Sequence, residues 1–234
     1  MQSSIILSLN SFMASSPLLI KIVPILADIF VFSYPLYLIY LYFFTHDSIA
    51  RWQRLWHKPA DRQHKHIALS ILSSFIGSVI VNYSIKAFIE QPRPYQVLDL
   101  LINPKESLIL NAIPTDSFPS DHAAVGATIA AAVLIRGYQT KNKSLIIAWW
   151  VFVGFALIMD ICRITMGVHR PIDIIAGIVI GIVVALILSC SLCITGSFLS
   201  KKKSSDCYRV RRDKRKVRIV KQLIQFKCFI PITD

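Results

Sequence analysis

The chain has 234 residues, of which 54% are hydrophobic and 17% are charged, and its formal net charge is +13. Its mean hydropathy is +0.56. A soluble domain of this length buries its core with far less apolar content, and the apolar residues here form continuous runs rather than strict alternation. These features exclude a soluble globular protein and a membrane β-barrel. They predict an all-α integral membrane protein.

The N-terminal segment Met1–Ser16 is only intermittently apolar and has no charged start. A cleavable signal peptide is therefore not expected. At helical spacing its large apolar residues fall on one face, which predicts an N-terminal interfacial helix lying at the membrane surface. These residues are Ile5, Ile6, Leu9, Phe12 and Met13.

Five apolar runs follow, and crossing a bilayer takes about 20 residues. In chain order they are Ile20–Phe44, Ile67–Ile89, His122–Ile135, Ser144–Ile161 and Ile172–Leu199. The third run is short by apolar count and needs its polar flanks to complete a span. The sequence predicts a bundle of about five transmembrane helices, with residues 1-200 as one membrane-embedded domain.

Basic residues mark one side of this bundle. The loops Thr45–His66 and Arg136–Lys143 are basic, and the tail Lys201–Asp234 holds twelve Lys and Arg against three Asp. With five spans all three segments fall on the same side, which the positive-inside rule assigns to the cytoplasm. Residues 201-234 then form a basic cytoplasmic tail. Attraction to anionic lipid explains its charge better than nucleic-acid binding does.

Three polar groups fall on the opposite, outer side. They are KAFIEQPRP at Lys86–Pro94, SFPSDH at Ser117–His122 and RITMGVHRPID at Arg163–Asp173. Lys and Arg side chains stabilise the charge of a transferring phosphoryl group, and a helix start favours an anion. Histidine serves as nucleophile or as general acid. The combination predicts a phosphate-handling site.

Each group also has a purely structural explanation when taken alone. The first fits a snorkelling helix end, the second a helix capped by Ser120 or Asp121, and the third an interfacial pair of His169 and Asp173. Their common side and order favour one joint site. A channel or transporter would place charge near the bilayer midplane, usually with repeated halves, and neither feature is evident here.

The ordered trio Lys86-x6-Arg93-Pro94, Pro119-Ser120-x-His122 and Arg163-x5-His169-x3-Asp173 resembles the signature of the type 2 phosphatidic acid phosphatase superfamily. The resemblance implies a membrane lipid phosphatase without metal or other cofactor. It also implies that His169 is a nucleophile forming a phosphohistidine, that Asp173 orients it, and that His122 protonates the leaving oxygen.

By the same resemblance, Lys86, Arg93, Ser120 and Arg163 would hold the phosphate. Asp121 stands where the superfamily more often has glycine, and it places a carboxyl beside the phosphate site. Because a negative charge there would repel a phosphate monoester, we expect a preference for lipid diphosphates over monophosphates.

The Pro-Ser-Asp-His sequence resembles the branch that contains undecaprenyl-diphosphate phosphatases of the bacitracin-resistance type. This resemblance implies hydrolysis of undecaprenyl diphosphate at the outer face of a bacterial inner (cytoplasmic) membrane, in recycling of the cell-wall carrier lipid. One alternative is the same phosphatase reaction on another lipid: phosphatidate, phosphatidylglycerophosphate or diacylglycerol diphosphate. Another is a lipid phosphotransferase, which passes the phosphate to a second lipid instead of to water.

Two acidic residues inside the spans are not part of these motifs. Asp160 lies three residues before Arg163 and is expected to pair with it. Asp28 lies between Pro24 and Pro35 in the first span. A structural role across helices is favoured for Asp28 over a place at the lipid entrance.

Overall fold

The computed structural model describes residues 2–43, 62–102 and 116–201, and the side chains of 64–102 and 116–189 within the last two ranges. The expected basic tail after Lys201 and most of the expected basic loop Thr45–His66 lie outside the described residues. Within the described ranges the chain forms helices and no β-strand. The prediction of an all-α membrane protein is confirmed.

The helices follow the expected runs closely, with two additions. In chain order they are α1 (Gln2–Ala14), α2 (Pro17–Ile29), the 3₁₀ turn η1 (Phe30–Phe32), α3 (Ser33–Phe43), α4 (Arg62–Lys86), α5 (Pro94–Val97), α6 (Asp121–Thr140), α7 (Lys143–Thr165) and α8 (Pro171–Lys201). Among the residues that the structure describes, four stretches are long and apolar enough to cross a membrane: Pro17–Phe43, His64–Lys86, Lys143–Thr165 and Pro171–Ser189.

The first span is not the single continuous helix that the apolar run predicts. It is divided into α2 and α3 by the 3₁₀ turn Phe30–Phe32. Pro35 lacks the amide N–H that would bond to the carbonyl of Val31 in this turn, which explains why the α-helical pattern breaks there. The break lies next to Asp28, the acidic residue of this span.

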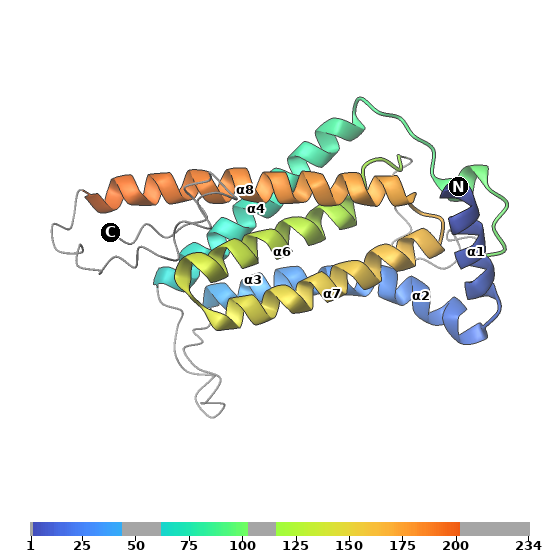
Figure 1. Ribbon diagram of the computed structural model, residues 1–234, viewed down its shortest axis with the longest axis horizontal. Coiled ribbons are helices and arrows are strands. Elements are labelled where there is room, and N and C mark those ends of the chain that lie inside the picture. The colour runs from blue at the N-terminus through green and yellow to red at the C-terminus, as the bar shows by residue number, and fades with distance from the viewer. Residues whose placement is uncertain (1, 44–61, 103–115, 202–234) are drawn as a thin grey trace, which may run out of the picture.

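Helix α6 is the interior helix of the bundle, and it contacts α4, α7 and α8 (Figure 1). It was expected as a short third span and is built largely from alanine and other small residues. Buried positions occur along its whole length, including Ala124, Ala132 and Ile135. A helix enclosed by other helices needs little apolar bulk of its own, which explains its modest hydropathy.

Helix α1 lies across one end of the bundle (Figure 1). Its buried residues are Ile6, Asn10 and Met13, whereas Phe12 is exposed. The side-chain amide of Asn10 donates to the carbonyl oxygen of Thr165 at 3.2 Å, at the end of α7. The expected helix is present, and a buried asparagine joins the apolar Ile6 and Met13 in attaching it to the bundle.

The starts of α6 and α8 approach to backbone contact. A Cβ added at Gly177 would lie 2.6 Å from the carbonyl oxygen of Ser120, and one at Gly181 would lie 2.3 Å from that of Ala124. The amide of Ser120 donates to the carbonyl oxygen of Asp173 at 3.1 Å. Glycine therefore allows the two helix starts that carry motif residues to lie side by side.

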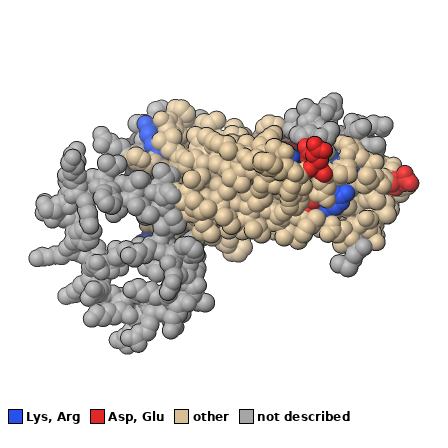
Figure 2. All heavy atoms as spheres, turned by 90° about the horizontal axis from the view of Figure 1, so that it is seen from above, with Lys and Arg blue, Asp and Glu red and all other residues tan. Residues whose placement is uncertain are grey.

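Charged side chains are unevenly placed along the molecule. On the face in Figure 2, the described Lys, Arg, Asp and Glu lie toward the two ends and leave a broad uncharged band between them. An uncharged band flanked by charged ends is the pattern expected of a bundle that crosses the hydrocarbon core of a membrane.

We expect Gly181→Ala to destabilise the bundle, because the added methyl group meets backbone rather than a movable side chain. Overpacking of this kind costs about 1–3 kcal/mol, against the roughly 1 kcal/mol that alanine gains over glycine in a helix. Gly154→Ala is the matched control, since nothing lies within 4 Å of its added Cβ. Thermal unfolding in detergent should show a lower Tm for Gly181→Ala only, and equal Tm values would contradict the close contact.

Candidate active site

The three polar groups meet at the end of the bundle that α1 crosses (Figure 1). Here α4 and α7 end while α6 and α8 begin. Lys86, Arg93, Ser120, Arg163 and His169 are all buried within this end. The joint site that the sequence predicts is thus spatially assembled, although several of its contacts differ from expectation.

Ser120 begins α6, as one of the two expected caps. Its backbone is extended, and its hydroxyl oxygen accepts from the amide of Ala123 at 3.5 Å. The side chain of Asp121 is in the first turn and extends toward α4 instead. The positive end of the α6 dipole therefore points into the site, where it favours an anion.

Asp121 is held by two residues of α4. Its carboxylate accepts from the ammonium group of Lys86 and from the side-chain amide of Asn82. Asp121 is therefore a paired carboxylate, and the motif lysine is already bound to it. Sequence reasoning missed Asn82, although its place one helical turn before Lys86 puts both side chains on the same face of α4.

Arg163 pairs with Asp28, not with Asp160 as expected. Its Nη2 donates to Asp28 Oδ1 at 2.5 Å, and its Nε donates to the carbonyl oxygen of Ala27 at 3.2 Å. Helix α2 packs against α7 and brings both acceptors to the arginine. Asp160 Oδ1 has no hydrogen-bond partner in the described part of the chain. A tertiary contact between helices has thus replaced the expected pairing along α7.

His122 lies next to this ion pair. Its Nε2 is 2.7 Å from Arg163 Nη2 and 3.9 Å from Asp28 Oδ1. A guanidinium group only donates hydrogen bonds, so Nε2 must accept in this arrangement and the ring proton belongs on Nδ1. Three side chains from α2, α6 and α7 are therefore linked through one guanidinium group.

His169 is in the turn between α7 and α8, and its Nδ1 is 2.8 Å from the carbonyl oxygen of Ser117. A carbonyl only accepts, so Nδ1 carries the proton and Nε2 keeps its lone pair. The ring is almost fully enclosed, with 1% of the residue exposed. The tautomer leaves Nε2 as the nitrogen that can act as a nucleophile.

Asp173 supports His169 less directly than expected. Its Oδ2 is 4.0 Å from His169 Nδ1, beyond hydrogen-bond distance. The same oxygen accepts from the hydroxyl of Ser117 at 2.5 Å and from the amide of Arg170 at 2.8 Å. Asp173 thus fixes the residue whose carbonyl orients the ring. Ser117, which has no assigned role in the sequence analysis, is the direct partner of the ring.

Arg93 completes the group of cations. It is 2% exposed, and its Nη1 donates to the carbonyl oxygen of Val168 at 3.2 Å, one residue before His169. In the described part of the chain no group of three or more His, Cys, Asp or Glu side chains is placed to hold a metal ion.

The site therefore combines fixed cations with a neutral imidazole. Lys86, Arg93 and Arg163 supply three positive charges, and the site also contains the carboxylates of Asp28, Asp121 and Asp173. Groups of this kind can bind a phosphate through charged donors, and an imidazole nitrogen with a free lone pair can act as a nucleophile toward it.

The chain belongs to the PAP2 superfamily, whose family model matches residues 67–192, more than half of the sequence. The matched range contains all eight of the residues that the sequence analysis assigned to the site.

Curated relatives share part of this chain. "Undecaprenyl-diphosphatase BcrC" of Bacillus subtilis is 26% identical over 133 residues, which cover 57% of this chain and 61% of the relative. "Undecaprenyl-diphosphatase" of Sulfolobus acidocaldarius is 29% identical over 121 residues, covering 51% of this chain and 52% of the relative. The chain thus matches between half and two thirds of the length of these relatives.

Among solved structures, the crystal structure of Aquifex aeolicus LpxE is similar, with a TM-score of 0.51 and 24% sequence identity. The similarity covers 77% of this chain and 90% of that one. At this level of identity the likeness establishes the fold.

Burial and the charges of Arg163, Arg93, His122 and Lys86, in that order, lower the pKa of His169 well below its ordinary 6.5. The unfolded chain then binds a proton near pH 6.5 that the folded chain binds only at lower pH. We therefore expect the free energy of unfolding to fall as the pH drops below 6.5 toward the folded pKa.

His169→Gln removes this titration. Tm measured from about pH 7.5 to about pH 5 should fall less steeply for the variant than for the wild type. Parallel curves would show that His169 titrates alike in the folded and unfolded chains.

Proposed function

We propose that this protein is a membrane lipid phosphatase that hydrolyses undecaprenyl diphosphate to undecaprenyl phosphate and inorganic phosphate. The observation that carries the proposal is the orientation of His169, whose Nδ1 donates to the Ser117 carbonyl so that its Nε2 keeps the lone pair, while Arg93 is bonded to the carbonyl of the preceding residue, Val168. Membership of the PAP2 superfamily and the names of the curated relatives support the reaction and the substrate.

In the first step, His169 Nε2 attacks the terminal phosphorus of the lipid diphosphate. An N–P bond forms, and the bond from that phosphorus to the bridging oxygen breaks. Once Arg163 has turned to the phosphate, His122 Nε2 is free to take up a proton, and His122 gives this proton to the oxygen of the departing undecaprenyl phosphate. Charge that develops on the transferring phosphoryl oxygens is stabilised by the fixed cations Lys86, Arg93 and Arg163.

In the second step, water attacks the phosphohistidine. His122 takes a proton from the water as the new P–O bond forms, and the P–N bond breaks. Inorganic phosphate leaves and His169 Nε2 regains its lone pair. The balance requires one water molecule for each diphosphate. Lys and Arg side chains of the protein stabilise the negative charge of the phosphoryl group, so the proposed mechanism uses no metal or other cofactor.

The carboxylates hold the cationic side chains in position before the substrate binds. Asp28 fixes Arg163, and Asp121 fixes Lys86. The oxygens of a bound phosphate compete for the same donors, so Arg163 would turn from His122 toward the phosphate and leave the imidazole to exchange its proton with the leaving oxygen. Ser120 would add its hydroxyl and the start of α6 to the same phosphate.

The basic segments give the orientation. With residues 1-200 in the membrane and the tail 201-234 on the cytoplasmic side, the site faces outward from a bacterial inner (cytoplasmic) membrane. An outward phosphatase of this kind returns the carrier lipid of cell-wall synthesis to its monophosphate. It would thereby lower the amount of undecaprenyl diphosphate available to bacitracin.

We expect His169→Ala to abolish phosphate release, because the attacking nitrogen is lost. Purified wild type should release phosphate from undecaprenyl diphosphate in a panel that includes phosphatidate, phosphatidylglycerophosphate and diacylglycerol diphosphate. It should also become labelled by substrate carrying ³²P in the terminal phosphate when quenched without acid. His66→Ala, an exposed histidine near the opposite end of α4, is the control and should retain activity.

Activity of His169→Ala at the wild-type level would show that His169 is not the nucleophile. Faster release from a glycerolipid than from undecaprenyl diphosphate would overturn the choice of substrate while leaving the chemistry intact.

Asp28→Asn keeps an acceptor for Arg163 but removes its charge. We expect kcat/KM to fall on the order of 10- to 100-fold, about 1.4–2.7 kcal/mol in transition-state stabilisation. Asp99→Asn, at an exposed position after α5, should leave kcat/KM unchanged. If Asp28 were only structural, its variant would lose Tm while the folded fraction kept wild-type kinetics.

A further inference from the structure

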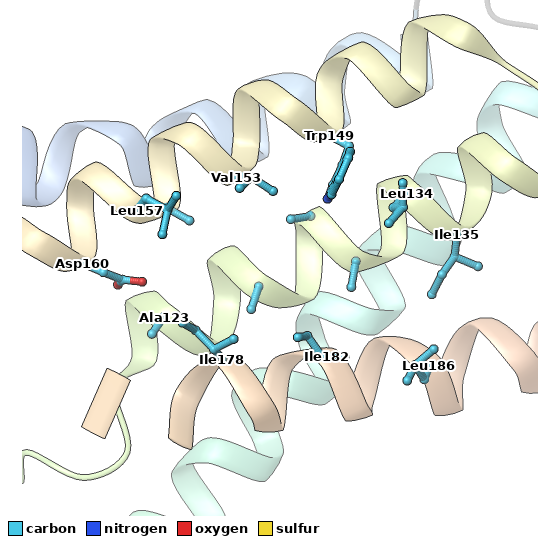
Figure 3. A pocket seen from close by; sticks show the side chains of 14 residues that line it. Ala123, Leu134, Ile135, Trp149, Val153, Leu157, Asp160, Ile178, Ile182 and Leu186 are labelled. Carbon is cyan, nitrogen blue, oxygen red and sulfur yellow. The ribbon is translucent and has the colours of Figure 1, made fainter. Parts of the chain in front are cut away.

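A cavity of about 500 Å³ lies between α6, α7 and α8. On one side are alanines of α6, including Ala123 and Ala127, and on the others are larger side chains such as Trp149 of α7 and Ile178 of α8 (Figure 3). Apart from Asp160 and the indole N–H of Trp149, the lining side chains are hydrocarbon. Its size is within the range of small-molecule sites.

One end of the cavity adjoins the candidate active site. Ala123 directly follows His122, and Asp160 lies three residues before Arg163 on α7. Figure 3 shows Ala123 and Asp160 at this end, with Trp149 at the other. From Ala123 to Ile135 the cavity runs along about 18 Å of helix. A molecule whose leaving oxygen meets His122 could therefore continue directly into it.

Asp160 gives the cavity a polar end. It is 5% exposed, it lines the cavity, and its Oδ1 has no hydrogen-bond partner in the described part of the chain. A buried carboxyl oxygen without a partner is costly, whereas the lining side chains beyond it are apolar except at Trp149. The fitting occupant is an amphiphile whose polar head stays at the active-site end and whose hydrocarbon lies along the cavity beyond Asp160.

We propose that this cavity holds the isoprenoid units nearest the diphosphate of a polyprenyl diphosphate. The inference rests on the proposed phosphatase activity and assigns the part of the protein that recognises the lipid. At about 30 Å³ for each water-sized group, the cavity has room for roughly seventeen such groups, close to three five-carbon units. The rest of a longer chain would lie in the bilayer.

The lining favours an isoprenoid over a glycerolipid. A glycerolipid carries two chains and two ester carbonyls within a few atoms of its phosphate. Such carbonyls would need donors inside the cavity, whose side chains beyond Asp160 are apolar except at Trp149, near the opposite end. An isoprenoid chain is single and apolar from its first carbon, and its methyl branches can lie against the alanines of α6.

The test fills the cavity one helical turn beyond Ala123. Ala127→Phe adds bulk about 6 Å along α6 from that end, so it should obstruct a long chain and spare a short one. We expect kcat/KM for farnesyl diphosphate to fall tenfold or more, and that for dimethylallyl diphosphate to change less than about twofold. Val179→Phe, at a 55% exposed neighbour of Ile178 outside the cavity, is the control and should change neither value.

Equal losses for both chain lengths in Ala127→Phe, at unchanged Tm, would overturn the assignment. So would equal effects of Ala127→Phe and Val179→Phe on farnesyl diphosphate. If Ala127→Phe slowed phosphatidate as much as farnesyl diphosphate, the cavity would hold acyl chains and the isoprenoid assignment would be wrong.

A binding measurement separates this inference from the proposed reaction. A farnesyl diphosphate analogue with a benzophenone at the chain end should crosslink to α6, α7 or α8 in His169→Ala, and excess farnesyl diphosphate should prevent it. Crosslinks to α4 or α3 alone would overturn the cavity assignment. Absence of phosphate release by the wild type, with crosslinking intact, would instead overturn the proposed activity and retain the isoprenoid site.

Discussion

The hydrogen bond from His169 Nδ1 to the Ser117 carbonyl depends on two helix starts lying at backbone contact. Gly177 and Gly181 on α8 allow this approach to α6. The amide of Ser120 then donates a hydrogen bond to the carbonyl oxygen of Asp173 and links the two helix starts. The buried imidazole has its direction fixed by a backbone oxygen that cannot rotate away. The orientation of the proposed nucleophile is thus a property of helix packing as much as of the motif residues themselves.

Charge in the site is arranged in pairs that cross between helices. Arg163 of α7 bonds to Asp28 of α2, and Lys86 of α4 bonds to Asp121 of α6. Burying three cations near lipid is costly unless each has a partner, and partners from other helices also fix the geometry. The same pairs would hold the cations where a phosphate can take over their donors, which is the preorganisation that phosphoryl transfer requires.

Polar and apolar side chains occupy separate regions within the bundle. The polar end collects the motif residues, and the cavity between α6, α7 and α8 continues from it with Asp160 as its polar boundary (Figure 3). The alanines that make α6 weakly hydrophobic also leave the space beside it. One feature of the sequence thereby explains both the interior position of this helix and the room next to it.

The sequence by itself determined the class of fold and predicted the motif residues that the fold brings together, but not Asn82, Ser117 or Asp28 beside them. Apolar runs of bilayer length can only be satisfied as helices, and the spacing of Lys86, Ser120, His122 and His169 places all of them at helix ends on one side. The break at Phe30–Phe32 follows from Pro35 but could not be distinguished from a simple kink.

Only the tertiary structure decided the partners. Arg163 had a plausible acid three residues away in Asp160, yet it bonds to Asp28, which is 135 positions distant. His169 had Asp173 at helical spacing, yet it bonds to the carbonyl of Ser117. Spacing along one helix indicates which side chains can meet locally. A buried polar group instead bonds to whichever partner a packed neighbouring helix brings to it. Here those neighbours are determined by the packing of α2 against α7 and of α6 against α8.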